Sequence, residues 1–333
     1  MGNNDNVLGI YAAHRRLSIS MNNGKEIKSV WVDIPEDIVK RGEIISKSLF
    51  TSFLKETLKE HGFKAKKAAF VIGSDQVFIR NVKMPMMNDE QLRYNLPFEF
   101  RDSINGELKD YLYDYAYRPS ETPEEGADAK TAELLAVAIP KEYYNSISEI
   151  VQMAGIKLIK AVPEVCVLES YLKKLETEED RNAERCFLDI GHTGVRFQIF
   201  KNGRFKLAQL IDIGEDHIVR AIADDMNVDF ELAQTYVRTQ YEDCGSREAA
   251  VNAYKDISVE VLKGFNYYEM SDMSSRLNEV VLYGSGAMID PLANMLKERI
   301  DKHVVTMNEL FPQYNKDNML NITAASIGVN FDN

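Results

Sequence analysis

Two glycine-containing turns have the residue types that bind phosphate in proteins. The first, LDIGHTG, spans residues 188–194 between two apolar stretches that predict strands. Glycines let backbone N–H groups approach a phosphate closely, and an aspartate can orient a magnesium ion through water. Asp189, Gly191 and Thr193 are therefore candidate nucleotide-binding residues. The same sequence also suits an ordinary hairpin turn, so this motif alone does not decide between the two interpretations.

The second turn, YGSG, spans residues 283–286, after a predicted strand and before a predicted helix. A nucleotide can rest against bare backbone at such a place, which makes Gly284 and Gly286 further candidates. The order of the elements is more specific than either turn. A DxG hairpin, three helices, a strand, a GxG turn and a helix follow one another in the second half of the chain.

Strands and helices alternate in the first half. Residues 7–19 and 28–32 predict strands, and residues 46–60 predict a helix that ends at Gly62. Residues 68–72 are continuously apolar and predict a strand covered on both faces. This alternation is typical of an α/β fold.

From about Phe78 the pattern changes, and a small insertion begins. Asn88 starts a variant of the capping box and opens a short helix that ends near Pro97. Four tyrosines alternate along residues 111–117, which places them on one face of a strand. Such a stripe serves either internal packing or contact with a partner.

The second half repeats the plan of the first, and the charged residues 175–184 are the expected hinge between them. Asn202-Gly203 is a strong hairpin signal. The predicted strands are residues 185–190, 194–200, 205–211 and 279–282, and the predicted helices are residues 217–226, 230–240 and 248–270. This is the plan of actin and the sugar kinases, in which a nucleotide lies between two related domains.

Composition argues against several other classes of protein. Lys+Arg 40 against Asp+Glu 52 gives a net charge of −12, which repels nucleic acid and anionic lipid. The three cysteines and five histidines lack metal-ligand spacing, so no metal site is expected. Neither a signal peptide nor a spanning helix is visible. We therefore expect a cytoplasmic protein that reaches the inner face of the membrane only through partners.

The sequence resembles the actin-like ATPase superfamily, and within it the PilM family of type IV pilus assembly proteins, with the cell-division protein FtsA as the nearest cousin. The resemblance spans nearly the whole chain. It is carried by residues 8–10 (LGI), 82–92 (VKMPMMNDEQL), 96–98 (LPF), 113–115 (YDY), 154–156 (AGI), 212–214 (DIG) and 324–328 (AASIG).

The resemblance implies an α/β, actin-like (ribonuclease H-like) two-domain fold with a small FtsA-type inserted subdomain. Residues 1–78 would form the first part of the first core domain, and residues 143–180 would continue it. Residues 79–142 would form the inserted subdomain. Residues 181–333 would form the second actin-like domain, with a C-terminal helix that returns toward the first.

The resemblance also implies a scaffold that captures the cytoplasmic tail of PilN, a bitopic membrane protein, and contacts other pilus platform and motor proteins, with self-assembly left open. Extended tails bind in apolar grooves through backbone bonds and a few side-chain pockets. We expect this groove between the inserted subdomain and the first core domain, where methionine side chains adapt to a partner. Its expected lining is Met84, Met86, Met87, Leu96 and Phe98.

The chain departs from the family where nucleotide chemistry should occur. Tyr11, Ala13 and Ser18 occupy the Asp, Gly and Lys positions of the first phosphate loop, and Gln234 and Val237 replace a Glu-x-x-Lys pair. Phosphoryl transfer depends on such charges, so hydrolysis is not expected and no catalytic residue is assigned. Two interpretations stay open: a degenerate site, or a working site that binds ATP with magnesium.

Two further classes of protein fit the sequence less well. An FtsA-like division protein needs an amphipathic membrane-targeting helix at its C-terminus, and none is visible in the sequence. A small-molecule kinase of the same superfold needs a catalytic aspartate after a sugar-binding segment. No such segment is recognisable, so the pilus assembly interpretation is favoured.

Overall fold

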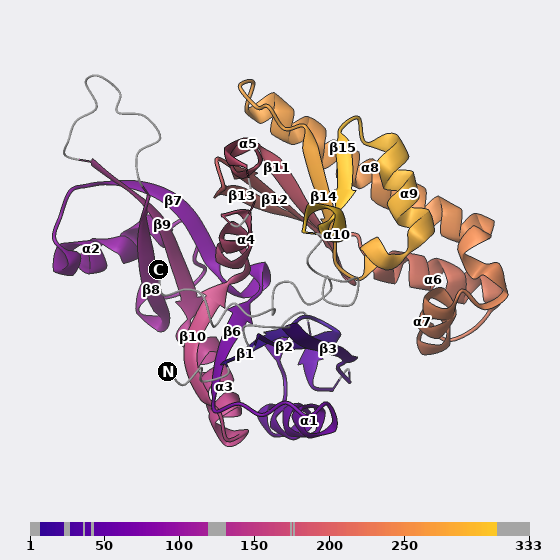
Figure 1. Cartoon of the computed structure of the whole chain (residues 1–333), viewed down its shortest axis with the longest axis horizontal. Coiled ribbons are helices and arrows are strands. Elements are labelled where there is room, and N and C mark those ends of the chain that lie inside the picture. Colours follow the sequence, from indigo (N-terminus) through magenta and orange to yellow (C-terminus); the bar gives the residue numbers. More distant parts are fainter. Residues whose placement is uncertain are drawn as a thin grey trace. The chain divides into compact units, whose positions relative to one another are not determined.

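The structure, a computed structural model, describes residues 7–22, 27–35, 37–40, 43–118, 131–173, 175 and 177–311. Contacts divide the chain inside helix α4 (Glu164–Leu172), so that the first unit runs to Glu164 and the second begins at Val165. Each unit has its own sheet and its own core (Figure 1). The expected return of a C-terminal helix, and the AASIG motif, lie outside the described residues.

The first unit is built on a five-stranded sheet in the order β10-β6-β1-β2-β3. The strands β1, β2 and β3 form an antiparallel meander, whereas β6 and β10 pair in parallel with β1 and β6 respectively. All of β1 is buried, as its apolar sequence predicts. The strands are β1 (Val7–Ala12), β2 (Arg16–Asn22), β3 (Ile27–Asp33), β6 (Lys67–Ile72) and β10 (Lys157–Pro163).

Two helices, α1 (Lys47–Glu60) and α3 (Lys141–Met153), pack against each other and contribute to the core of this sheet. The side chain of Ser46 caps α1 by accepting a hydrogen bond from the N–H of Leu49. The short strands β4 (Val39–Lys40) and β5 (Glu43–Ile44) pair separately, and a 3₁₀ turn η1 (Ser74–Gln76) follows β6. The strand and helix predictions for residues 46–72 are therefore confirmed.

The segment that the sequence assigns to an inserted subdomain contains a separate three-stranded antiparallel sheet, with β9 (Thr131–Pro140) between β7 (Phe78–Pro85) and β8 (Tyr111–Arg118). It has its own small core. The predicted capping box is present, since Asn88 and Gln91 exchange hydrogen bonds at the start of α2. The remaining elements are α2 (Asp89–Asn95) and the 3₁₀ helices η2 (Leu96–Phe100) and η3 (Leu108–Asp110).

The tyrosines of β8 take the alternating positions that the sequence predicts. Tyr111, Tyr113 and Tyr115 are half-buried and pack on the core of the inserted subdomain, whereas Tyr117 is exposed. The hydroxyl of Tyr113 donates to the carbonyl of Leu108 at 2.8 Å. Most of the stripe therefore serves internal packing.

The second unit repeats the arrangement of the first, with a sheet in the order β13-β12-β11-β14-β15. Again three strands form an antiparallel meander and two more pair in parallel. The predicted Asn202-Gly203 hairpin is confirmed, since both residues have positive φ. The strands are β11 (Arg185–Ile190), β12 (Val195–Lys201), β13 (Arg204–Ile211), β14 (Glu279–Tyr283) and β15 (His303–Thr306).

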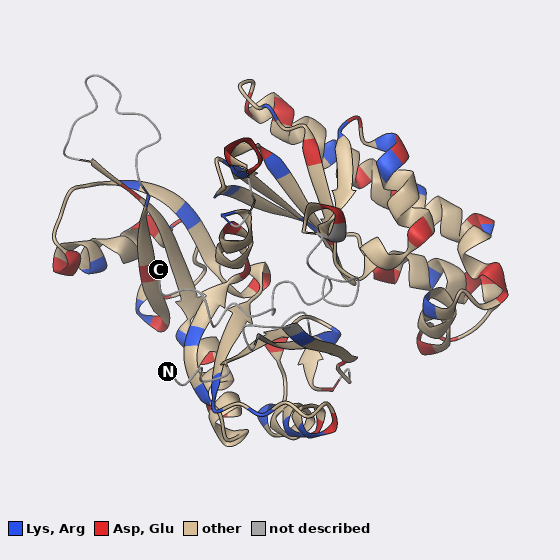
Figure 2. Ribbon diagram, in the orientation of Figure 1, with Lys and Arg blue, Asp and Glu red and all other residues tan. Residues whose placement is uncertain are grey.

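Helices of this unit supply an apolar core in which Phe265 of α8 (Glu248–Ser271) lies edge-on to Phe197, with the ring centroids 4.7 Å apart. Charges of both signs are interspersed along these helices, while the strands carry few (Figure 2). The helical elements are α5 (Glu178–Asn182), α6 (Glu215–Met226), α7 (Phe230–Thr239), η4 (Tyr241–Ser246), α8 (Glu248–Ser271), η5 (Gly286–Met288), α9 (Asp290–Arg299) and α10 (Met307–Leu310).

The division between the units differs from the expected hinge at residues 175–184. The stretch belongs to the second unit because Glu184 is buried there and accepts hydrogen bonds from the N–H of Arg276 at 2.8 Å and the hydroxyl of Ser275 at 3.0 Å. The hydroxyl of Tyr268 also donates to this carboxylate. Among the helices described, none is both long and apolar enough to cross a membrane.

Candidate functional site

The DxG turn joins β11 to β12, and its aspartate is paired within the protein. Asp189 stands opposite Arg196 in the antiparallel register, and Nη1 of Arg196 lies 2.6 Å from Oδ2 of Asp189. Only 9% of the Asp189 side chain and 14% of the Arg196 side chain are exposed. An ion pair this sheltered neutralises the carboxylate that we expected to orient magnesium.

The carbonyls of the same turn already bind the start of helix α6. The N–H of Glu215 donates to the carbonyl of Gly191 at 3.0 Å, and the N–H of Asp216 donates to the carbonyl of His192 at 2.8 Å. Gly214 permits this approach, since a methyl group there would lie 2.5 Å from the Gly191 oxygen. The N–H groups at the start of a helix attract anions when they are free. Here two of them already donate to carbonyls, and both belong to residues with acidic side chains.

The GxG turn after β14 lies directly against the end of β11. Gly284 has φ +88°, and a methyl group on it would lie 2.2 Å from Oδ1 of Asp189. A methyl group on Gly286 would lie 2.2 Å from the Ile190 side chain. The structure therefore brings Asp189, Gly284 and Gly286 together, and Gly191 lies two residues after Asp189 in the same turn.

Thr193 is exposed at the tip of the β11–β12 turn, whereas the neighbouring His192 is buried. Nδ1 of His192 lies 3.1 Å from Oε2 of Glu215, whose side chain is also largely buried. Sequence reasoning missed His192, Glu215 and Arg196. The hairpin register would have found Arg196, because it lies as far after the turn as Asp189 lies before it.

In the first unit, the first phosphate loop of the family corresponds to residues that pack in the interior or close a turn. Tyr11 and Ser18 face each other across the β1–β2 ladder, and both are buried. The phenol of Tyr11 lies against Gly73, where a methyl group would be 3.5 Å from the hydroxyl. The N–H of Ala13 donates to the carbonyl of Arg16 at 2.9 Å and closes the turn. In the second unit Val237 of α7 is a core residue.

The five residues expected to line the partner groove divide between the interior and the surface. Met84 and Leu96 belong to the core of the inserted subdomain, with 4% and 0% of each residue exposed. Met86 and Phe98 are 57% and 46% exposed, and Met87 is half-buried. The exposed ring of Tyr94 lies edge-on to Phe98 at 6.2 Å, which sequence reasoning missed.

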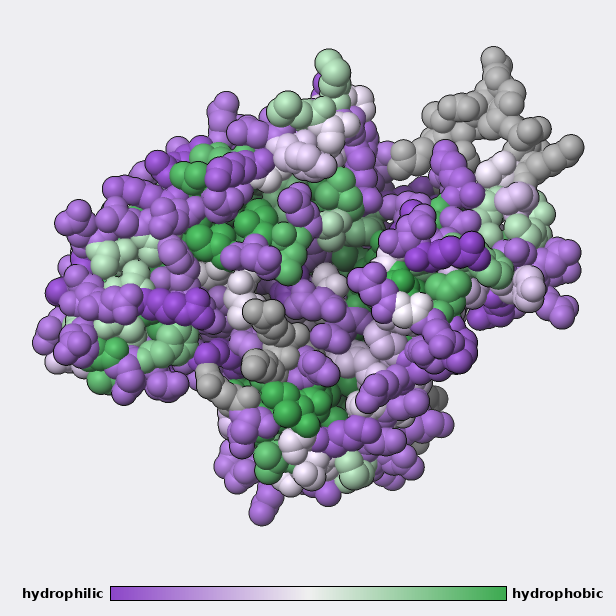
Figure 3. Space-filling model, turned by 180° about the vertical axis from the view of Figure 1, so that it is seen from behind, coloured by the Kyte–Doolittle hydropathy of each residue, from purple (hydrophilic) through white to green (hydrophobic). Residues whose placement is uncertain are grey.

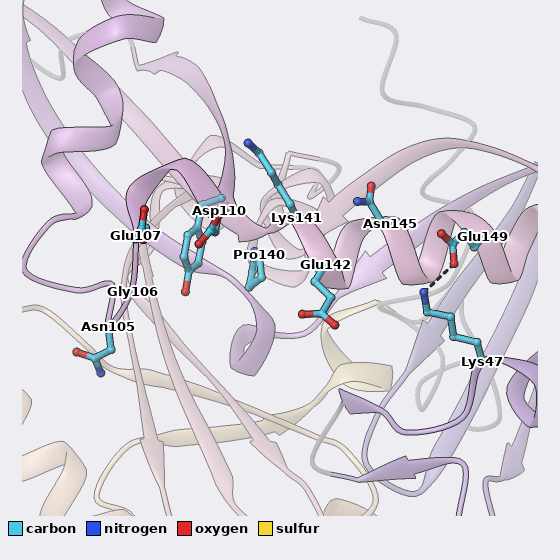
Figure 4. Close-up of a pocket in the computed structure, with 11 residues that line it drawn as sticks. Lys47, Asn105, Gly106, Glu107, Asp110, Pro140, Lys141, Glu142, Asn145 and Glu149 are labelled. Atoms are coloured by element: carbon cyan, nitrogen blue, oxygen red, sulfur yellow. Dashed lines mark hydrogen bonds and ion pairs between the residues drawn. The ribbon is translucent and has the colours of Figure 1, made fainter.

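A cavity of about 640 Å³ lies within the first unit, between the inserted subdomain and helix α3 (Figure 4). None of the five residues just described lines it. Its lining is polar, unlike the apolar groove that the sequence predicted. The lining residues are Lys47, Asn105, Gly106, Glu107, Asp110, Tyr111, Pro140, Lys141, Glu142, Asn145 and Glu149.

Two five-stranded sheets of the same order, one in each unit, are typical of the actin-like ATPase class of folds. The chain belongs to the family of type IV pilus assembly proteins PilM, whose model matches residues 21–321. No curated protein sequence matches it significantly.

Solved structures of low sequence identity share this fold. The PilM-PilN type IV pilus biogenesis complex matches with a TM-score of 0.79 and 16% identity, covering 97% of this chain and 98% of the other. The ethanolamine utilization protein EutJ from Carboxydothermus hydrogenoformans matches with a TM-score of 0.59, 12% identity and coverages of 95% and 86%. MreB5 of Spiroplasma citri bound to ADP matches with a TM-score of 0.55, 9% identity and coverages of 97% and 95%.

Proposed function

We propose that this chain is a scaffold of the type IV pilus inner-membrane assembly platform that binds the cytoplasmic tail of a PilN-like bitopic protein. The observation that carries the proposal is its membership of the PilM family, together with a fold shared over nearly its whole length with PilM in the PilM-PilN complex. In this role the chain would be held at the inner face of the membrane by its partner and would link it to other platform and motor proteins.

The junction between the inserted subdomain and α3 is the proposed place of the tail. A cavity of about 640 Å³ is in the size range of sites that enclose a small ligand or a few side chains. Met86 and Phe98, exposed on the inserted subdomain, would offer the tail a separate apolar contact, since the register pairs Pro85, next to Met86, with Thr131 at the end of β9 opposite to Pro140 of the cavity. The buried Met84 and Leu96 belong to the core beneath them.

Exposed apolar side chains also occur away from this junction. On the second unit Met270 and Met273 are 83% and 94% exposed, and hydrophobic patches alternate with hydrophilic ones on the face seen from behind (Figure 3). Such patches often mark protein contacts. They give a scaffold surfaces for further partners, or for a second copy of itself, without competing for the cavity.

The proposed scaffold has a degenerate nucleotide site. Support comes from the Asp189–Arg196 pair, which neutralises the carboxylate, and from the buried Tyr11 and Ser18 where the family places a carboxylate and a lysine. Phosphoryl transfer needs cations aimed at the phosphates and a coordinated magnesium ion. The chain would therefore work without ATP hydrolysis.

A second candidate function is an ATP-binding protein of the same family. The observation that favours it is the clustering of Asp189, Gly191, Gly284 and Gly286 at the carboxyl end of β11. Structures of MreB 5 of Spiroplasma citri hold ADP or AMPPNP in the same class of fold. Titration of a fluorescent ATP analogue with magnesium separates the candidates: saturable binding that Asp189→Ala abolishes would favour this one.

Vesicle flotation tests the scaffold proposal itself. The full chain is mixed with anionic vesicles that carry the full-length PilN-like protein, the same protein without its cytoplasmic tail, or no protein. We expect the chain to float only with the first. Flotation with bare vesicles would contradict recruitment through a partner, and failure to float with any of them would contradict the assignment of the partner.

A further inference from the structure

Lysine side chains gather at one end of the first unit, where helix α1 ends and strands β6 and β10 begin. Residues 59–67 contain four lysines and one glutamate, and residues 157–160 contain two lysines and no acidic residue. Figure 2 shows basic residues concentrated around the starts of these two strands. This local excess of positive charge contrasts with the net charge of −12 of the whole chain.

The fold brings these lysines together although they come from separate segments. β6 and β10 are neighbouring parallel strands, and their register places Lys67 beside Lys157. The N–H of Lys157 donates to the carbonyl of Lys66 at 2.9 Å. Lys28 of β3 reaches the same end, where its Nζ donates to the carbonyl of Gly62 at 3.3 Å. This surface, called the lysine end below, consists of Lys28, Lys59, Lys64, Lys66, Lys67 and Lys157.

Most of the lysine end has no counter-charge within the protein. Lys59, Lys64, Lys66 and Lys157 are exposed, and none of them forms an ion pair with a residue that the structure describes. The ammonium of Lys28 lies 4.8 Å from the ring centroid of Phe63. Neighbouring charges of one sign repel each other, and an opposite charge outside the chain relieves that repulsion. These lysines can therefore contact a negatively charged surface outside the chain.

Two exposed apolar side chains lie at the same end of the first unit. Met153, the last residue of α3, is 47% exposed, and Ile159 of β10 is 37% exposed. Ile159 lies at an irregularity between Leu158 and Lys160 and has no register partner in β6. Basic residues beside apolar ones are the combination by which peripheral proteins rest on anionic lipid.

We propose that the lysine end contacts anionic lipid headgroups once the bitopic partner has brought the chain to the membrane. The inference rests on the proposed function and adds the surface that the first unit turns toward the lipid. The cytoplasmic leaflet has a negative surface potential that attracts clusters of lysine. At physiological salt, charges are screened beyond ~8 Å. The lysine end therefore feels the lipid, whereas acidic residues elsewhere on the chain oppose the contact only weakly.

The lipid contact strengthens attachment through the partner and does not replace it. Stable attachment of a peripheral protein to a bilayer usually needs two signals. Here the tail of the bitopic protein supplies the first signal and the lysine end supplies the second. We therefore still expect the chain not to float with bare anionic vesicles.

Vesicles that carry the full-length PilN-like protein test the inference. One set contains phosphatidylcholine alone, and in the other set phosphatidylglycerol replaces part of the phosphatidylcholine. Flotation at physiological salt measures the affinity of the full chain, of a lysine-end variant and of a matched variant for both sets. The control lysines are exposed, belong to the second unit and give the same change of net charge. The two variants are Lys64→Gln, Lys66→Gln, Lys157→Gln and Lys173→Gln, Lys255→Gln, Lys263→Gln.

We expect phosphatidylglycerol to raise the affinity of the native chain at least fivefold and that of the lysine-end variant less than twofold. The matched variant should keep the gain of the native chain within twofold. High salt should abolish the gain, because it screens the attraction. Equal gains for the two variants would overturn the inference, since they would exclude a special role of this end.

The phosphatidylcholine vesicles separate the lipid from the partner protein as the source of negative charge. If the lysine-end variant loses affinity for these vesicles too, its lysines contact the partner protein, and the lipid inference is wrong. If the native chain binds both sets of vesicles equally, the partner assignment stands and the lipid contact fails. If the native chain binds neither set, the proposed function fails, and the inference fails with it.

Discussion

Arg196 and Asp189 face each other across the β11–β12 ladder, and Nη1 of Arg196 lies 2.6 Å from Oδ2 of Asp189. The pair gives the aspartate of the DxG turn a partner within its own chain, which supports the proposal of a degenerate nucleotide site. It also gives the turn a structural role that can be measured separately from any binding.

The first prediction concerns this pair. Removing one partner of a buried ion pair leaves a charge uncompensated, which typically costs about 3–5 kcal/mol. We therefore expect Asp189→Asn and Arg196→Gln each to lower the free energy of unfolding by about 3 kcal/mol. The double variant should lose clearly less than the sum, as measured by urea denaturation in a double-mutant cycle. Strict additivity would show that the two side chains do not stabilise each other.

The second prediction concerns the glycine turn. Gly284→Ala should destabilise the fold by at least ~2 kcal/mol, since φ +88° is strained for alanine and its methyl group would lie 2.2 Å from Oδ1 of Asp189. Gly106→Ala is the matched control, because a methyl group there meets no atom within 4 Å. Thermal melts measure the unfolding midpoints of both variants. Similar midpoints would mean that the turn tolerates a side chain and that its packing is looser than described.

The third prediction compares two methionines that are two residues apart. Met86→Glu should leave the unfolding midpoint nearly unchanged, because Met86 is 57% exposed. It should weaken tail binding about tenfold, a loss of ~1.4 kcal/mol. Met84→Glu should instead destabilise the inserted subdomain strongly, since it would bury an unpaired charge. Undiminished tail affinity of a stably folded Met86→Glu would remove Met86 from the partner surface.

The fourth prediction concerns pH. Burial opposes ionisation of Glu184, but hydrogen bonds from Tyr268, from the N–H of Arg276 and from Ser275 hold its pKa below the ordinary value of 4.5. A pKa lowered by folding adds stability that is present above about pH 4.5 and lost as the pH falls through the folded value. Denaturation between pH 7 and pH 3 should therefore show a steeper loss for the native chain than for Glu184→Gln. The exposed Glu178→Gln should follow the native chain, and identical slopes for all three would refute the role of Glu184.

Much of the fold could be predicted because the local sequence signals for strands, helix caps and turns agree with the folded structure. The apolar run of residues 68–72 forms a buried strand, Asn88 forms its capping box, and Asn202-Gly203 adopts the left-handed geometry of a hairpin. The boundary between the units could not be predicted in the same way. It depends on bonds such as that from Tyr268 to Glu184, whose partners are far apart in the sequence.

The candidate sites could be predicted only in part, because they too depend on contacts between residues far apart in the sequence. The sequence names both glycine turns as candidate nucleotide-binding residues, and the folded chain places Gly284 against Asp189. The family motif suggested Met84 as a surface residue, but strand alternation from Val82 places Met84 on the same inward face. The cavity at α3 is lined by residues from three separate segments, and only the folded chain brings Lys47, Asp110 and Glu142 to one place.

Calorimetric titration of the tail peptide into the full chain, with and without magnesium and ATP, tests the central claim most directly. The claim is that a member of the PilM family binds its partner through the first unit and without help from nucleotide. We predict saturable binding with the same dissociation constant, within twofold, in both conditions. Binding that appears only with ATP, or no binding in either condition, would contradict the account.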